Sequence, residues 1–127
     1  VELFSGSWGD LNLDDIALRE IYKEAFIVII PLKESSQPSG QSVALQAMAM
    51  GIPVLISETE GFWDKKDLQN EVNLFLISPN TPGEWVRKIN YLSNNKKLLE
   101  KVSSEAQKTV SNNFNLTVFQ DMLKAYI

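Results

Sequence analysis

The chain has 127 residues, 44% of them apolar, and its 12 basic and 16 acidic residues give a formal net charge of −4. This length and apolar share fit one domain with a buried core, and the acidic balance argues against sequence-independent nucleic-acid binding, which needs clustered positive charge. The absence of His and Cys excludes disulfides, thiol nucleophiles, and catalytic or metal sites built on His.

The first part of the chain predicts a strand, a loop and a helix. Residues 1–4 are expected to form a short strand, and the glycine-containing stretch 5–10 is expected to form a loop. Asn12 is expected to cap an amphipathic helix over residues 13–24. The Asp14–Asp15 pair would then lie in its first turn, at the positive end of the helix dipole.

The middle of the chain predicts buried strands on either side of a helix. The continuous apolar run 26–30 is typical of a strand covered on both faces, as in a parallel sheet. After a polar loop, a helix is expected from Ser42 to Met50, with Gly51 as its C′ residue. The apolar runs 54–56 and 73–77 predict two further strands.

The C-terminal part predicts three helices. Residues 81–84, Thr-Pro-Gly-Glu, have the order of a capping box, and the helix that follows places Trp85 on its core-facing side. Two more helices are expected around residues 98–110 and 119–126. Short strands that alternate with helices predict an α/β fold: a doubly wound, Rossmann-like parallel sheet with helices on both faces, followed by C-terminal helices.

The best candidate for a binding site is the turn from the polar loop into the second helix. In open α/β sheets, ligands bind beyond the carboxyl ends of the strands. Ser39, Gly40 and Ser42 stand where the first helical turn can present backbone N–H groups and hydroxyls to a phosphate. The alternative is that Ser39 or Ser42 only caps the helix and Gly40 only shapes the turn, and the spacing alone leaves both interpretations open.

This region resembles the C-terminal domain of group 1 retaining glycosyltransferases, which form one half of the GT-B architecture. In that family a strand ending in Pro leads to a helix reading Leu-Glu-Ala-Met-Ala-x-Gly, then Pro-Val and a strand. Residues 45–54 of this chain read Leu-Gln-Ala-Met-Ala-Met-Gly-Ile-Pro-Val, and residues 39–42 resemble a Ser-x-Gly-x-Ser/Thr loop of one branch. Similar segments at 4–6, 21–25 and 73–79 extend the resemblance over nearly the whole chain.

The resemblance implies that residues 1–127 are a donor-binding domain for a nucleotide diphosphate sugar. The N-terminus of the second helix would hold the diphosphate, Gln46 would lie at the ribose where the family has Glu, and the loop after the first strand would lie near the base. The donor-binding residues expected from the matching positions are Gly6, Ser7, Ser39, Gly40, Gln41, Ser42, Val43 and Gln46. Pro38 occupies the position of the family's sugar-binding Glu, and Glu34 is the candidate to replace it, with no other catalytic residue assigned.

The resemblance also implies an activity for the intact protein. It would be a cytoplasmic retaining glycosyltransferase of polysaccharide biosynthesis that transfers a sugar to a carbohydrate or lipid-linked acceptor, without metal or cofactor. Because the chain begins with Val inside a predicted strand, we expect an acceptor domain of the same protein and a first βα unit outside it, and no activity from this part alone. The alternative is a non-catalytic interaction or nucleotide-binding module derived from such an enzyme, since Gln46 and Pro38 depart from the family.

The remaining aromatic and basic residues have structural explanations. Trp8 and Trp63 are expected to pack with their own loops, although Trp8 could instead stack on the base and Trp63 could line the cleft. The lysines at 65–66 and 96–101 are expected to form solvated faces. A peripheral contact with the inner face of a membrane is the alternative for an enzyme that acts on lipid-linked sugars.

Overall fold

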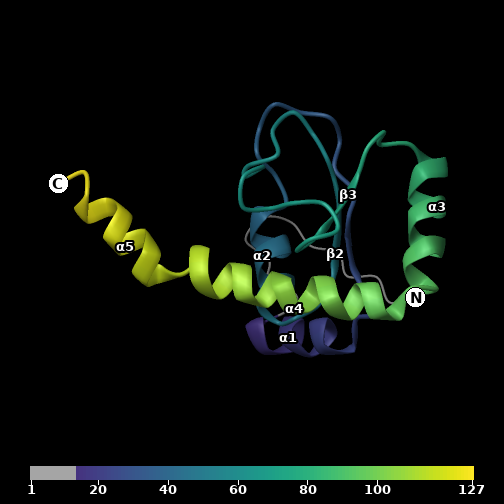
Figure 1. The fold of residues 1–127 in the computed structure, drawn as a ribbon, viewed down its shortest axis with the longest axis horizontal. Coiled ribbons are helices and arrows are strands. Elements are labelled where there is room, and N and C mark those ends of the chain that lie inside the picture. Colours follow the sequence, from purple (N-terminus) through teal and green to yellow (C-terminus); the bar gives the residue numbers. More distant parts are fainter. Residues whose placement is uncertain (1–13) are drawn as a thin grey trace.

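The computed structural model of the protein describes residues 14–127 (Figure 1). The predictions that concern residues 1–13, including the first strand, Gly6, Ser7, Trp8 and the Asn12 cap, lie outside the described residues. Helix α1 (Asp15–Glu24) has Asp14 as its N-cap, whose side chain accepts a hydrogen bond from the Ala17 N–H at 2.7 Å. The prediction that Asp14 lies within the first turn is therefore wrong, because Asp14 precedes the helix and its carboxylate caps the N-terminus.

The sheet has three parallel strands in the order β1 (Val28–Ile30), β2 (Val54–Ser57), β3 (Phe75–Ile77). The central strand β2 is buried at every residue, as expected for a strand covered on both faces. Strand β1 differs from the prediction, since Ile29 is 41% exposed. The reason is that β1 lies at an edge of the described sheet, whereas α3 packs against β3 at the opposite edge.

Helices cover both faces of the sheet and divide the core into two clusters, which confirms the doubly wound α/β prediction. On one face, α2 (Gln41–Ala49) packs on β1 and β2, and Ile56 points into the first cluster. On the other face, α3 (Pro82–Ser93) and the first half of α4 (Lys96–Asn113) cover the second cluster, into which Leu55 points, whereas Ala106 of α4 belongs to the first cluster. The alternation of Leu55 and Ile56 is what a strand between two layers requires.

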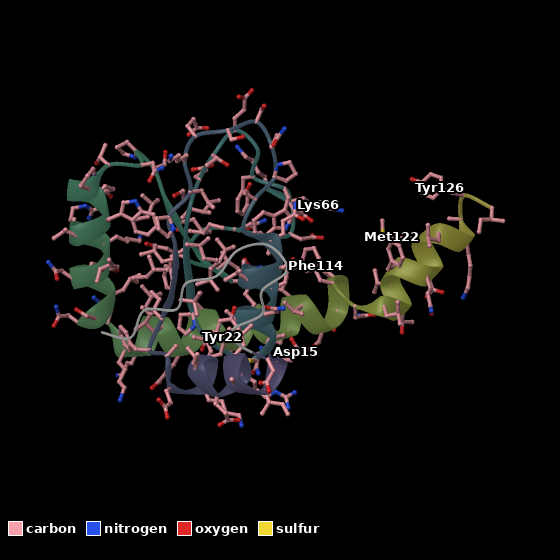
Figure 2. All side chains as sticks on the ribbon, turned by 180° about the vertical axis from the view of Figure 1, so that it is seen from behind. Asp15, Tyr22, Lys66, Phe114, Met122 and Tyr126 are labelled. Atoms are coloured by element: carbon pink, nitrogen blue, oxygen red, sulfur yellow. The ribbon has the colours of Figure 1, made fainter. Side chains whose placement is uncertain are left out.

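Helix α4 runs past the amino ends of the strands, and α5 (Leu116–Lys124) projects from the body of the molecule (Figure 1). No residue of α5 is buried, and Met122 and Tyr126 lie on the projecting segment (Figure 2). The lysines at 65–66, 96–97 and 101 are exposed, as predicted for solvated faces. Among residues 14–127, no helix combines the length and apolar character needed to cross a membrane.

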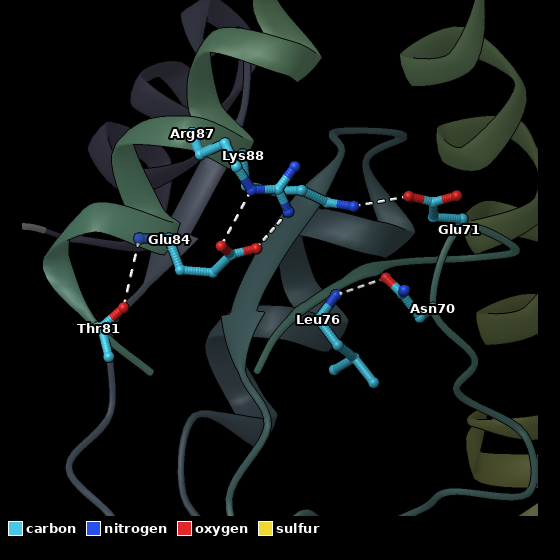
Figure 3. A network of polar contacts seen from close by, with 7 residues as sticks. All are labelled: Asn70, Glu71, Leu76, Thr81, Glu84, Arg87 and Lys88. Carbon is cyan, nitrogen blue, oxygen red and sulfur yellow. Dashed lines mark hydrogen bonds and ion pairs between the residues drawn. The ribbon is translucent and has the colours of Figure 1, made fainter. Parts of the chain in front are cut away.

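The start of α3 forms half of the predicted capping box (Figure 3). Thr81 is the N-cap, and its hydroxyl accepts a hydrogen bond from the Glu84 N–H at 3.4 Å. The reciprocal bond is not formed, because the Glu84 carboxylate binds Arg87 instead. The hydrogen bond from Arg87 also lowers the pKa of the Glu84 carboxyl below its ordinary value.

One buried charge on α3 was not predicted. Lys88 is only 8% exposed, and its Nζ lies 2.6 Å from Glu71 Oε1 (Figure 3). The same ammonium group lies 5.7 Å from the centroid of the Phe75 ring and 5.5 Å from that of Tyr91. The carboxylate and the two ring faces provide the partners that a buried cation requires.

Candidate functional site

The carboxyl ends of the three parallel strands meet at one edge of the sheet, which is the upper edge in Figure 1. The loops 31–40 and 58–74 leave the strands at this edge, and α2 begins there. The predicted site segment, Ser39 to Val43, therefore lies where parallel α/β sheets bind their ligands.

The N-terminus of α2 lacks a side-chain cap. Its N-cap residue is Gly40, with φ 75° and ψ 0°, and the first helical hydrogen bond runs from the Ala44 N–H to the Gly40 carbonyl at 3.0 Å. Within residues 14–127, the N–H groups of Gln41, Ser42 and Val43 have no hydrogen-bond acceptor. Three donors at the positive end of a helix dipole form an anion-binding arrangement.

The two serines of the site do not cap the helix. The capping alternative for Ser39 and Ser42 is thus wrong, because Gly40 holds the cap position without a side chain. Both serines are exposed. Their hydroxyls therefore face solvent beside the free N–H groups and can supply further hydrogen bonds to an anion.

Gly40 is required by the backbone and by the core. Its φ of +75° is in the left-handed region, which disfavours residues with a Cβ. A Cβ at this position would lie 3.0 Å from Ile30 Cγ2 and 3.2 Å from Ile56 Cδ1. The missing side chain thus leaves room for the core beneath the helix N-terminus.

Two loops beside the site are fastened to each other. The Glu34 carboxylate accepts a hydrogen bond from the Glu60 N–H at 2.8 Å, and the Gly61 N–H donates to the Ser35 carbonyl at 2.8 Å. A Cβ at Gly61 would lie 2.4 Å from the Gln37 carbonyl oxygen, so a side chain there would force the two loops apart. Glu34, the candidate for the sugar-binding Glu, is thus exposed and engaged by one oxygen in this loop contact.

Gln46 lies one turn along α2 from Ser42 and lines a cavity between α1 and α2. The Tyr22 hydroxyl donates a hydrogen bond to Gln46 Oε1 at 3.4 Å, and burial raises the pKa of that hydroxyl above its ordinary value. The tyrosine therefore stays protonated and able to donate. The cavity has a volume of about 320 Å³ and is lined by Asp15, Leu18, Arg19, Tyr22, Gln46, Ala49 and Met50. Figure 2 labels Asp15 and Tyr22 of this set.

The tryptophans confirm the packing predictions where they can be described. Trp63 packs against the first core cluster and its ring lies 4.7 Å from that of Phe62, centroid to centroid. Trp85 packs against the second cluster. The Trp85 indole Nε1 also donates to Asn80 Oδ1 at 2.8 Å, a polar contact that helical periodicity could not indicate. Within residues 14–127, no three or more acidic side chains are grouped as a metal site would require.

Comparison with known proteins identifies the family of this chain. The family model described as Glycosyl transferases group 1 matches residues 8–95, which include the sheet, α2 and the loops around the site. The chain belongs to the group 1 glycosyl transferases. The resemblance of this glycosyltransferase chain to the group 1 family is thus confirmed, because the match covers more than half of its length. A search of curated protein sequences found no match.

Solved structures share this fold, and two of them are named as glycosyltransferases. The chain is 24% identical to a glycosyltransferase from Rickettsia africae, with a TM-score of 0.70 over 89% of this chain and 30% of the other. It is 21% identical to the C-terminal domain of the group 1 glycosyl transferase LpcC from Francisella tularensis, with a TM-score of 0.67 over 81% and 50% of the two chains. Anabaena HepE, solved with UDP-glucose, is 23% identical, with a TM-score of 0.69 over 87% and 29%. The chain thus spans half or less of the length of each relative.

Proposed function

We propose that this domain binds the diphosphate of a nucleotide sugar at the N-terminus of α2. The observation that carries the proposal is the uncapped helix start at the carboxyl edge of the sheet, where the N–H groups of Gln41, Ser42 and Val43 have no acceptor among residues 14–127. The relative HepE has been solved with UDP and with UDP-glucose. A diphosphate matches this arrangement because its oxygens are strong acceptors and its charge is favoured by the helix dipole.

The nucleoside would extend from the diphosphate along α2. Ser42 and Gln46 are four residues apart on one face of the helix, so a ribose would meet Gln46 directly after the phosphates. The cavity beyond it, with Tyr22 and Arg19, offers apolar surface and polar groups of both signs. In this proposal Gly6 and Ser7 lie near the base.

The intact protein would be a retaining glycosyltransferase that transfers the sugar to a carbohydrate or lipid-linked acceptor. The acceptor would be held by another domain of the same protein, with residues 1–127 as the C-terminal, donor-binding domain. Catalysis would rest on positioning the two substrates and on stabilising the leaving diphosphate by the helix N–H groups, without a protein-bound metal.

A single added carboxylate at the α2 N-terminus tests the proposal. Ser42→Asp places a negative charge in the first turn of α2, where it competes with an anionic ligand but favours the helix itself. We expect the affinity for UDP or GDP, measured by calorimetry on the protein, to fall at least about tenfold. We expect stability to urea to stay the same or to rise by about 0.3–1 kcal/mol.

Gly83→Asp is the matched control for this experiment. Gly83 is the second residue of α3, as Ser42 is of α2, and no atom lies within 4 Å of an added Cβ. The substitution makes the same change in net charge at the same helix position, and it should leave nucleotide affinity unchanged. Equal affinities for wild type and Ser42→Asp would refute the phosphate assignment.

A second candidate function is a non-catalytic module that descends from a glycosyltransferase. The observations that favour it are the exposed Pro38, the Glu34 carboxylate used in a loop contact, and the neutral Gln46 at the expected ribose position. Such a domain would keep the fold and lose part of its affinity for the donor.

Gln46→Glu distinguishes the two functions. A carboxylate accepts hydrogen bonds from ribose hydroxyls more strongly than an amide, and Tyr22 can donate to either group. If the site is a weakened one, UDP or GDP affinity should rise by about threefold to tenfold by calorimetry. A loss of affinity would show instead that the Gln46 amide itself donates to the ligand and is the functional choice.

A further inference from the structure

Side-chain hydrogen bonds tie together the three strand ends beside the proposed donor site. Ser57, the last residue of β2, is fully buried, and its Oγ accepts a hydrogen bond from the Leu32 N–H at 2.9 Å. Asn80, which follows β3, donates from Nδ2 to the Leu32 carbonyl at 2.7 Å. Both backbone groups of Leu32, two residues beyond β1, are therefore held by side chains from the neighbouring strand connections.

The orientation of the Asn80 amide is fixed by two other donors. Its Oδ1 accepts from Ser57 Oγ at 3.3 Å and from Trp85 Nε1 at 2.8 Å. Because both donors approach the oxygen, the Nδ2 group is the one that faces Leu32. Trp85 is itself held by the second core cluster, so the network is anchored in the packed interior.

Leu32 connects this network to the start of α2. It is the second residue of the loop 31–40, and its Cδ1 would lie 3.5 Å from a Cβ at Gly40. The loop between these two residues is further fixed by the Gly61–Ser35 hydrogen bond. A shift of Leu32 would thus be transmitted both along the loop and through direct packing under the N-cap.

We propose that Asn80 is a positioning residue of the donor site, which fixes the N-terminal N–H groups of α2 relative to the strand ends by holding the Leu32 backbone. The inference rests on the proposed function. Asn80 acts through Leu32 and Gly40, and its contribution follows from the sensitivity of preorganised binding groups to displacements of about 1 Å.

The test compares Asn80→Ala with Asn73→Ala in the same protein. Asn73 is a matched control, because it also joins distant segments by three hydrogen bonds, with Asp67, Thr109 and Gln69, at 2.7–2.9 Å. We expect Asn73→Ala to lose at least as much stability in urea as Asn80→Ala, because Asn73 is buried whereas Asn80 is exposed. By calorimetry, only Asn80→Ala should weaken UDP or GDP binding, by about fivefold to tenfold, and Trp85→Phe should cause a smaller loss in the same direction.

Hydrogen exchange without nucleotide separates this inference from the proposed function. The hydrogen-bonded N–H groups of Leu32 and Ala44 should exchange faster in Asn80→Ala and at the wild-type rate in Asn73→Ala. If the wild type binds neither UDP nor GDP, the proposed function fails, while this difference in exchange would still support the positioning role. Unchanged exchange in Asn80→Ala would overturn the positioning role. Where the wild type binds nucleotide, equal affinities of the two alanine variants would overturn it as well.

Discussion

Gly40→Asp is expected to abolish nucleotide diphosphate binding and to destabilise the domain. The substituted residue would have to adopt φ +75° with its Cβ 3.0 Å from Ile30 Cγ2, which together cost about 2–4 kcal/mol. Its carboxylate would also lie at the uncapped N–H groups and repel the ligand. We expect a loss of at least about 100-fold in UDP or GDP affinity, measured by calorimetry at a temperature where the variant is folded.

Gly51→Asp separates binding from folding in this experiment. Gly51, at the other end of α2, also has a positive φ, of 72°, and an added Cβ would lie 2.9 Å from the Gln107 side chain. The variant gains the same charge at the unfavourable, negative end of the helix dipole, so it should also lose stability. It should keep its affinity for the nucleotide, whereas a loss equal to that of Gly40→Asp would assign the effect to folding alone.

Phe75→Ala is expected to cause the largest loss of stability away from the site. Phe75 is fully buried in β3, belongs to the second core cluster and supports the Lys88 ammonium group. Removal of such a ring leaves a cavity and lowers the free energy of unfolding by about 3–5 kcal/mol, to be measured by urea denaturation.

Phe119→Ala is the control, because the same side chain on α5 is 58% exposed. It should change the free energy of unfolding by less than about 1 kcal/mol. Equal losses for the two variants would contradict two observations: that no residue of α5 is buried, and that Phe75 is part of the second core cluster.

Most of the fold could be predicted from local sequence signals. Buried apolar runs predicted β1, β2 and β3, and the glycine at 51 was correctly expected to end α2, where it adopts a positive φ. Two of the errors arose where several groups compete for one role. Asp14 caps α1 itself, and Glu84 binds Arg87 in place of the backbone of the capping box. Local propensity does not decide such competitions, because several partners lie within reach.

The candidate site could be predicted only in part, for a different reason. The segment from Ser39 to Val43 is contiguous, so its spacing and the family resemblance both indicate a helix N-terminus. The Asn80–Leu32 bond joins residues 48 positions apart, and the contact of Glu34 with Glu60 joins residues 26 apart. These partners are brought together by the parallel crossover topology, and no local pattern marks them.

The alternation of side chains along β2 has a consequence for how this domain tolerates sequence change. Ile56 belongs to the cluster beneath α2 and the proposed site, whereas its neighbour Leu55 belongs to the cluster under α3 and the first half of α4. The strand thus acts as a partition between a ligand layer and a supporting layer. Because substitutions without shared partners combine nearly additively, substitutions under α3 can raise or lower stability while the ligand layer keeps its shape. Substitutions in the ligand layer that change specificity and lower stability can correspondingly be offset by stabilising substitutions in the supporting layer.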